Sequence, residues 1–218
     1  MARIFADLSV KDLFPTPIWI GDLEPALAQR LNTDLKTAIS DLIEPRPPIP
    51  LGSTWQTSPM LQQHPRFAEF TALVRKAGEA ALDFLDVKHK EFEITGLWAN
   101  INPTGGLNSP HTHPNNFLSG VYYVSLPDDE GHIVFSDPRP QAAGILPQVK
   151  KWNKYVGNEI KLEIKPGRMV MFPAWLVHSV PVNRSPQERI SISFNIMFNN
   201  FAEAMSKPLW TGTAPVRR

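Results

Sequence analysis

Residues 105–124 read GGLNSPHTHPNNFLSGVYYV, and FLSGVYYVSLP (117–127) has the β-branched and aromatic residues of a β-strand. Just before this strand, HTHPNN (111–116) places two of the chain's six histidines one residue apart. Side chains at positions i and i+2 of an extended segment point to the same face, so the imidazoles of His111 and His113 would lean into one small volume. The stretch therefore predicts a β-strand next to a pair of imidazoles that suits a metal ion.

Further short strand patterns flank this stretch at regular spacing. They are FPTPIWIGDL (14–23), EFEITGLWANINP (91–103), GHIVFSDP (131–138), NEIKLEIKP (158–166), GRMVMFPAW (167–175) and RISISFNIMF (189–198). Proline ends many of these apolar runs, and KPG at 165–167 is a turn signal. Many short strands separated by turns are typical of an antiparallel sandwich or barrel.

Two amphipathic helices are expected before the strand-rich part. In 25–44 the apolar residues recur at helical spacing, and Pro25 suits the first turn. This stripe comprises Leu27, Leu31, Leu35, Ile39 and Leu42. A second stripe runs through 64–87, and the proline-rich EPRPPIP (44–50) between them predicts an extended surface connector. Helices followed by strands indicate an α+β domain, mainly β, in which the helices buttress the β-structure.

Composition excludes several classes of protein. The chain of 218 residues has 22 basic and 21 acidic residues, so no net charge points to nucleic acid or a membrane surface as a partner. It has no cysteine, which excludes disulfides, thiolate metal sites and a cysteine nucleophile. The first residues lack the apolar segment of a signal peptide, and no apolar run is long enough to span a bilayer. These features favour a cytoplasmic protein.

A third histidine lies where a distant strand ends. PGRMVMFPAWLVH (166–178) runs from an apolar strand to a tight loop and ends in His178. Strand ends can meet in the mouth of a closed β-structure, where three neutral imidazoles on one face of an ion would leave positions open for other ligands. About ten residues further on, Arg189 opens a strand, and Ser191 shares its face. The guanidinium fork of Arg189 is suited to a carboxylate.

These motifs together resemble the 2-oxoglutarate/Fe(II) dioxygenase superfamily. Over roughly 96–198 the chain is most similar to a bacterial and phage family with the patterns HxHPxxxxSGVYY and FPxWxxHxVxP followed by RISISFN. FPAWLVHSVPVN is similar to the distal-histidine stretch of prolyl hydroxylases, and HTHPNN resembles the first-histidine stretch of aspartyl β-hydroxylases. The resemblance implies a double-stranded β-helix (jelly roll, cupin-like). We expect a single domain over 1–218: N-terminal strand and helical support over 1–89, the double-stranded β-helix core over 90–200, and a C-terminal tail over 201–218.

The resemblance also implies cofactors and an activity. Fe(II) would be held by His111, His113 and His178, and 2-oxoglutarate by Arg189 and Ser191. Decarboxylation of 2-oxoglutarate to succinate would accompany hydroxylation of a C–H bond in a small-molecule or peptide substrate.

Other residues are candidates for supporting roles in the same site. Tyr123 would reach the cosubstrate if it shares the inward face of its strand, and Asn100 and Asn195 are candidates for positions just behind the ligands. The superfamily usually has Asp or Glu where this chain has His113. The third ligand is therefore His113, the carboxylate of Asp137, or water.

Other interpretations remain open at the level of sequence. The jelly roll could be a non-catalytic metal-binding sensor or scaffold, or a zinc hydrolase with three histidines. A carboxylate clamp at Arg189 and Ser191 has no use in zinc hydrolysis and so favours the oxygenase. Loops 44–60 and 140–157 are expected to line the mouth, and the apolar FNIMF (194–198) to be an edge strand that could pair in a homodimer. The remaining histidines, His64, His89 and His132, are expected at the surface, and Trp98 and Trp175 in core or rim packing.

Overall fold

The computed structural model describes residues 4, 7–88, 91–127, 132–144 and 147–199. Two antiparallel sheets face each other, with strand orders β1-β8-β5-β10-β3-β2 and β4-β9-β6-β7. The strands are β1 (Trp19–Asp22), β2 (Trp55–Gln56), β3 (Phe92–Asn102), β4 (Asn108–His111), β5 (Leu118–Ser125), β6 (His132–Ser136), β7 (Glu159–Glu163), β8 (Arg168–Pro173), β9 (His178–Val180) and β10 (Arg189–Phe198). The expected mainly-β sandwich is thus confirmed.

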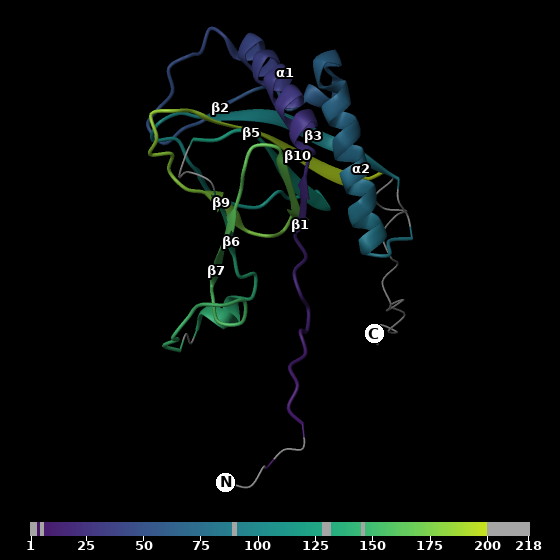
Figure 1. The fold of residues 1–218 in the computed structure, drawn as a ribbon, viewed down its shortest axis with the longest axis vertical. Helices are drawn as coiled ribbons and strands as arrows, with labels where there is room; N and C mark the ends of the chain where they lie inside the picture. Colours follow the sequence, from purple (N-terminus) through teal and green to yellow (C-terminus); the bar gives the residue numbers. More distant parts are fainter. Residues whose placement is uncertain (1–3, 5–6, 89–90, 128–131, 145–146, 200–218) are drawn as a thin grey trace, which may run out of the picture.

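Two helices cover the outer face of the larger sheet (Figure 1). They are α1 (Pro25–Ile43) and α2 (Ala68–Phe84), and the 3-10 turns η1 (Leu61–Gln63) and η2 (Pro65–Phe67) precede α2. The predicted stripe of α1 is buried at Leu31, Leu35 and Ile39, but Leu42 is 43% exposed because the helix ends at the next residue. The short 3-10 turn η3 (Pro140–Ala143) lies in the loop after β6. None of the helices in the described ranges is long and apolar enough to cross a membrane.

Alternation along β10 separates the helical core from the interior between the sheets. Ile190, Ile192 and Phe194 pack in the cluster that also contains the helix side chains. The intervening residues Arg189 and Ser191 point the other way, into a pocket between the two sheets. In β5 the same alternation places Tyr122 against the helices and Tyr123 in the inner cluster. The sheet therefore presents an apolar face to the helices and a partly polar face to the pocket.

The structure corrects one prediction about the edge of the sheet. FNIMF (194–198) forms the end of β10, which lies between β5 and β3 and so is an interior strand. From Phe194 to Ile196 its backbone is paired with both β5 and β3, so this part cannot join a second copy of the chain as an edge strand. The apolar composition of this segment reflects burial within the sheet rather than a dimer contact.

Three short strands were not predicted, and two of them carry the histidines. β2, β4 and β9 are two to four residues long. β4 has the sequence NSPH, whose proline and polar residues give no strand pattern, and it is held by pairing with β9. The strand expected at 14–23 is confined to Trp19–Asp22. His89 and the tail 201–218 lie outside the described residues.

Close packing across the larger sheet yields a prediction about stability. A Cβ atom on Gly120 would lie 2.2 Å from Cζ of Phe194, its cross-strand partner. We therefore expect Gly120→Ala to lower the free energy of unfolding by about 1–3 kcal/mol, measured by urea denaturation. Gly21→Ala is the matched control, because nothing lies within 4 Å of the added methyl group. Equal stability of the two variants would show that β5 and β10 pack less closely than described.

Candidate metal centre and its pocket

Two of the three histidines belong to neighbouring strands of the smaller sheet. His111 is the last residue of β4, His178 is the first of β9, and the two are direct cross-strand partners. His113 follows in the next turn, where its backbone N–H donates to the carbonyl of Ala174 at 2.9 Å. That bond ties the loop after β4 to the loop after β8. The sequence-predicted trio is thereby brought to one place.

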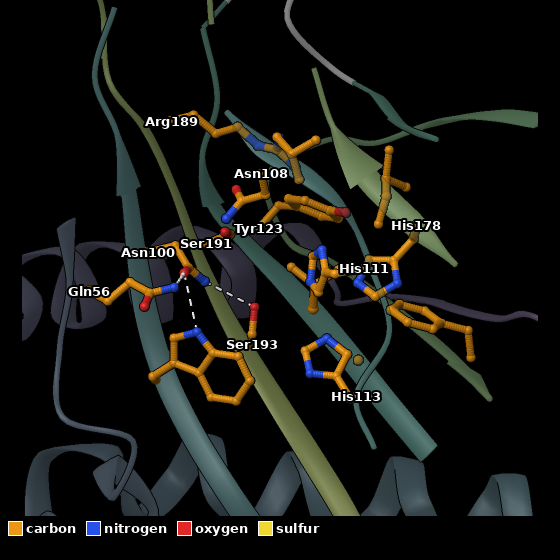
Figure 2. A pocket seen from close by; sticks show the side chains of 16 residues that line it. Gln56, Asn100, Asn108, His111, His113, Tyr123, His178, Arg189, Ser191 and Ser193 are labelled. Atoms are coloured by element: carbon orange, nitrogen blue, oxygen red, sulfur yellow. Dashed lines mark hydrogen bonds between the residues drawn. The ribbon is translucent and has the colours of Figure 1, made fainter. Parts of the chain in front are cut away.

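The three imidazole rings converge (Figure 2). Ring centroids are 4.3 Å apart for His111 and His178, 5.0 Å for His111 and His113, and 5.2 Å for His113 and His178. One nitrogen from each ring lies within 4.8 Å of the other two. These are the only three His or acidic side chains in the described part of the chain that gather in this way. Nitrogens at this spacing can coordinate a single cation.

Backbone carbonyls fix which nitrogen of two rings is available. Nδ1 of His111 lies 2.7 Å from the carbonyl of Ser109, and Nδ1 of His178 lies 3.0 Å from the carbonyl of Leu176. A carbonyl can only accept, so both Nδ1 atoms carry the proton in this arrangement. Each Nε2 then keeps its lone pair and can bind a metal ion, as in protein sites where the second ring nitrogen is held by a carbonyl.

Burial keeps the imidazoles in the form that a metal requires. It lowers the pKa of His113 to about 4, and the nearby imidazole of His111 adds to this effect. Burial likewise lowers the pKa of His178 to about 4. Both rings are therefore neutral at pH 7. A neutral imidazole binds a cation without first losing a proton.

The opposite end of the pocket carries a buried cation and a buried phenol. Arg189 is 2% exposed, and its guanidinium carbon lies 5.4 Å from the ring centre of Tyr123. Ser191 lies directly across from Tyr123 in the β10–β5 pairing. Burial raises the pKa of Tyr123 to about 12, opposed by the positive charge of Arg189, so the phenol stays protonated. Its hydroxyl interacts with the Arg189 guanidinium but donates to no acceptor among the described residues, and a carboxylate in the pocket would supply that acceptor.

A single pocket joins these two ends. It encloses about 490 Å³, part of which is open to solvent. His111, His113 and His178 lie toward one end, and Arg189 and Tyr123 toward the other (Figure 2). The pocket is thus suited to a carboxylate ligand that also reaches a metal at the histidines.

Two candidates for supporting roles lie outside the pocket lining. Both carboxylate oxygens of Asp137 are bonded to Arg139, at 3.0 and 2.7 Å, and Asp137 is not in the histidine group. The Arg139 guanidinium holds the pKa of Asp137 below its usual value. Asn195 accepts a hydrogen bond from Ser119 at 2.7 Å and does not line the pocket. The structure thus favours His113 over Asp137 as the third ligand.

Several lining residues were not predicted from the sequence. Gln56, Asn108 and Ser193 line the pocket, together with the predicted Asn100. Trp98 was expected in packing alone, yet it lines the pocket with its ring centre 5.9 Å from that of His113. Position 193 could have been found, because it continues the inward alternation of Arg189 and Ser191. Gln56 could not, because its place depends on the pairing of β2 with β3.

Comparison of the sequence with family models identifies one similar family. Residues 96–195 match the family described as "Putative 2OG-Fe(II) oxygenase", and this range contains all three histidines and Arg189. The match supports the predicted resemblance to the 2OG-Fe(II) oxygenase superfamily. The predicted cofactors, Fe(II) and 2-oxoglutarate, are the two that the description of this family names. The donor set of three imidazoles and the buried Tyr123 hydroxyl fit these two groups.

Solved structures of the superfamily share the fold. The 2-oxoglutarate-dependent epimerase SnoN from nogalamycin biosynthesis aligns with a TM-score of 0.61 and 12% identity, over 84% of this chain and 79% of SnoN. A Pseudomonas putida prolyl-4-hydroxylase aligns with a TM-score of 0.56 and 14% identity, over 84% of this chain and 94% of the hydroxylase. HygX from Streptomyces hygroscopicus, bound to nickel and 2-oxoglutarate, aligns with a TM-score of 0.55 and 9% identity, over 84% of this chain and 83% of HygX. The double-stranded β-helix is thereby confirmed. No curated protein matches the sequence.

Proposed function

We propose that this 2OG-Fe(II) oxygenase hydroxylates an amino-acid, peptide or other small-molecule substrate at a metal held by His111, His113 and His178. The observation that carries the proposal is the convergence of these three imidazoles at one end of a pocket whose other end holds Arg189 and Tyr123. In His111 and His178 a backbone carbonyl holds Nδ1, which leaves Nε2 as the nitrogen that can bind the ion. When bound, the iron supplies the oxygen chemistry that converts 2-oxoglutarate to succinate and carbon dioxide and oxidises the substrate.

Arg189, Ser191 and Tyr123 are proposed to hold the far carboxylate of 2-oxoglutarate. A guanidinium offers two parallel donors to a carboxylate, and the two hydroxyls offer one each. Arg189 is excluded from water, so its attraction to an anion is screened far less than at the surface. The residues of this chain thus orient the cosubstrate so that its keto acid end faces the histidines.

His113 stands where the superfamily usually has Asp or Glu, and this difference changes the charge of the proposed site. An aspartate at this position would neutralise one charge of the metal ion, whereas a neutral imidazole leaves the full charge in the pocket. An anionic cosubstrate is attracted more strongly as a result. The backbone of His113 is held by its hydrogen bond to the carbonyl of Ala174, and its ring packs near Trp98.

The proposed class of substrate is inferred from structurally similar proteins. They include a prolyl-4-hydroxylase from Pseudomonas putida and the viral collagen prolyl hydroxylase of Paramecium Bursaria Chlorella virus-1, which aligns with a TM-score of 0.51 and 12% identity. The epimerase SnoN and the carbocyclase SnoK act in nogalamycin biosynthesis. Hydroxylation of a peptide or small molecule is the reaction that we propose for this chain.

Anaerobic reconstitution tests the proposed function. Fe(II) and 2-oxoglutarate added together should give a weak metal-to-ligand absorption band in the visible, and oxygen with a suitable substrate source such as cell extract should then give succinate. A protein reconstituted with Zn(II) is the control and should show neither. Tight zinc binding without any effect of 2-oxoglutarate would support a zinc hydrolase instead. The band without succinate formation would support a non-catalytic sensor.

A further inference from the structure

One side of the pocket is a network of uncharged hydrogen-bonding side chains, which we call the amide wall. It consists of Gln56 on β2, Trp98 and Asn100 on β3, and Ser193 on β10. Asn100 Oδ1 accepts from Gln56 Nε2 at 2.8 Å and from Trp98 Nε1 at 3.2 Å, while Asn100 Nδ2 donates to Ser193 Oγ at 2.9 Å. Figure 2 shows the wall across the pocket from His113 and His178.

The network fixes which polar atoms remain for a ligand. Two donors occupy Asn100 Oδ1, so the orientation of this amide is set. Among the described contacts, Oε1 of Gln56 and the hydroxyl hydrogen of Ser193 are not used within the wall. The wall therefore offers one acceptor and at least one donor to a molecule in the pocket.

The permanent charge of the described residues around the amide wall is positive. Among the described residues, no Asp or Glu lines the pocket, and Arg189 is the one permanently charged side chain of the lining. A metal ion at the histidines would add further positive charge. A cationic group beside Asn100, which is 5% exposed, would thus lose its hydration without gaining a carboxylate partner, and it would lie near other positive charges.

The Trp98 indole lies between the amide wall and the histidines. Its Nε1 is bonded to Asn100, and its ring centre is 5.9 Å from that of His113. This fixed ring offers an apolar surface next to the proposed metal site. The apolar body of a substrate could pack on it while a polar group reaches Gln56.

We propose that the amide wall is the substrate compartment and that it selects an uncharged group able to donate and accept hydrogen bonds, an amide or a hydroxyl, over an ammonium group. This rests on the proposed function, because the reacting carbon must lie near the metal. Gln56 and Ser193 would bond the polar group, and Trp98 would contact the adjoining apolar part.

Three probes that share a phenethyl body test this selectivity. The full-length protein is loaded anaerobically with Mn(II) and 2-oxoglutarate, and calorimetry gives the Kd of N-acetylphenethylamine, 2-phenylethanol and phenethylammonium. We expect at least one neutral probe to bind at least about tenfold more tightly than the cation. The amide and alcohol arms distinguish the two neutral groups. Equal affinity of the cation, or no binding of either neutral probe, would overturn the proposal.

Gln56→Glu sharpens the test with a change of charge at constant size. It should reverse the order of the probes, so that the cation becomes the tightest. Gln29→Glu on the exposed surface of α1 is the matched control and should keep the original order. An unchanged order in Gln56→Glu would remove Gln56 from the site. Binding of 2-oxoglutarate is measured first in each protein. A wild-type protein that does not bind 2-oxoglutarate would refute the proposed function rather than the selectivity.

Discussion

Replacing Arg189 by alanine is expected to raise the Kd of 2-oxoglutarate at least about 100-fold while the metal content stays near that of the wild type. The guanidinium is the buried cation at the far end of the pocket, next to Tyr123 and opposite the histidines. Its loss removes the partner of the carboxylate without touching a metal ligand. Anaerobic titration of the Fe(II) protein with 2-oxoglutarate, followed through the visible band, measures the effect.

Two further variants control for folding and for the geometry of the fork. Arg189→Lys keeps the charge but not the paired donors, and should bind 2-oxoglutarate with intermediate affinity. Arg139→Ala removes an exposed arginine that is bonded to Asp137 outside the pocket, and should bind normally. If Arg189→Ala loses metal and 2-oxoglutarate together, Arg189 has a structural role and the carboxylate clamp is wrong.

The second large effect concerns His113, the residue that stands where relatives of this superfamily usually have a carboxylate. His113→Ala should lower the affinity for Fe(II) at least about 100-fold, because two imidazoles alone hold the ion weakly. His113→Asp should retain the metal, since a carboxylate can take the same position. Competition with a chelator of known affinity measures both.

His64→Ala is the matched control for the removal of an imidazole. His64 lies at the start of η2, where its Nδ1 accepts from the backbone N–H of Arg66, and it does not line the pocket. Its loss should leave the metal affinity unchanged. Full iron occupancy in His113→Ala would place His113 outside the coordination sphere and leave a site of two histidines.

The parts of the fold that follow from local periodicity were predictable. The stripe of α1 and the alternation in β5 and β10 are visible because each repeats over at least two turns or four strand residues. β4 and β9 are not visible in this way. Their residues form strands because His111 and His178 pair across the smaller sheet, and such a contact between distant residues has no local pattern.

The same distinction applies to the site. The histidines and Arg189 could be proposed because they occur in a recognisable order, and the structure brings the predicted trio together. Gln56 and Asn100 meet only because β2 pairs with β3 over two residues, so no spacing in the sequence reveals the amide wall. Asp137 was an alternative third ligand, and the structure shows both of its carboxylate oxygens bonded to Arg139.

The most direct measurement is a crystal structure of the protein grown without oxygen in the presence of Mn(II) and 2-oxoglutarate. We expect one ion with Nε2 of His111 and His178 and a ring nitrogen of His113 each at roughly 2 Å. The far carboxylate of 2-oxoglutarate should contact the guanidinium of Arg189 and the hydroxyl of Tyr123. An ion held by other residues, histidine rings that point apart, or an Arg189 side chain turned away from the carboxylate would contradict the account.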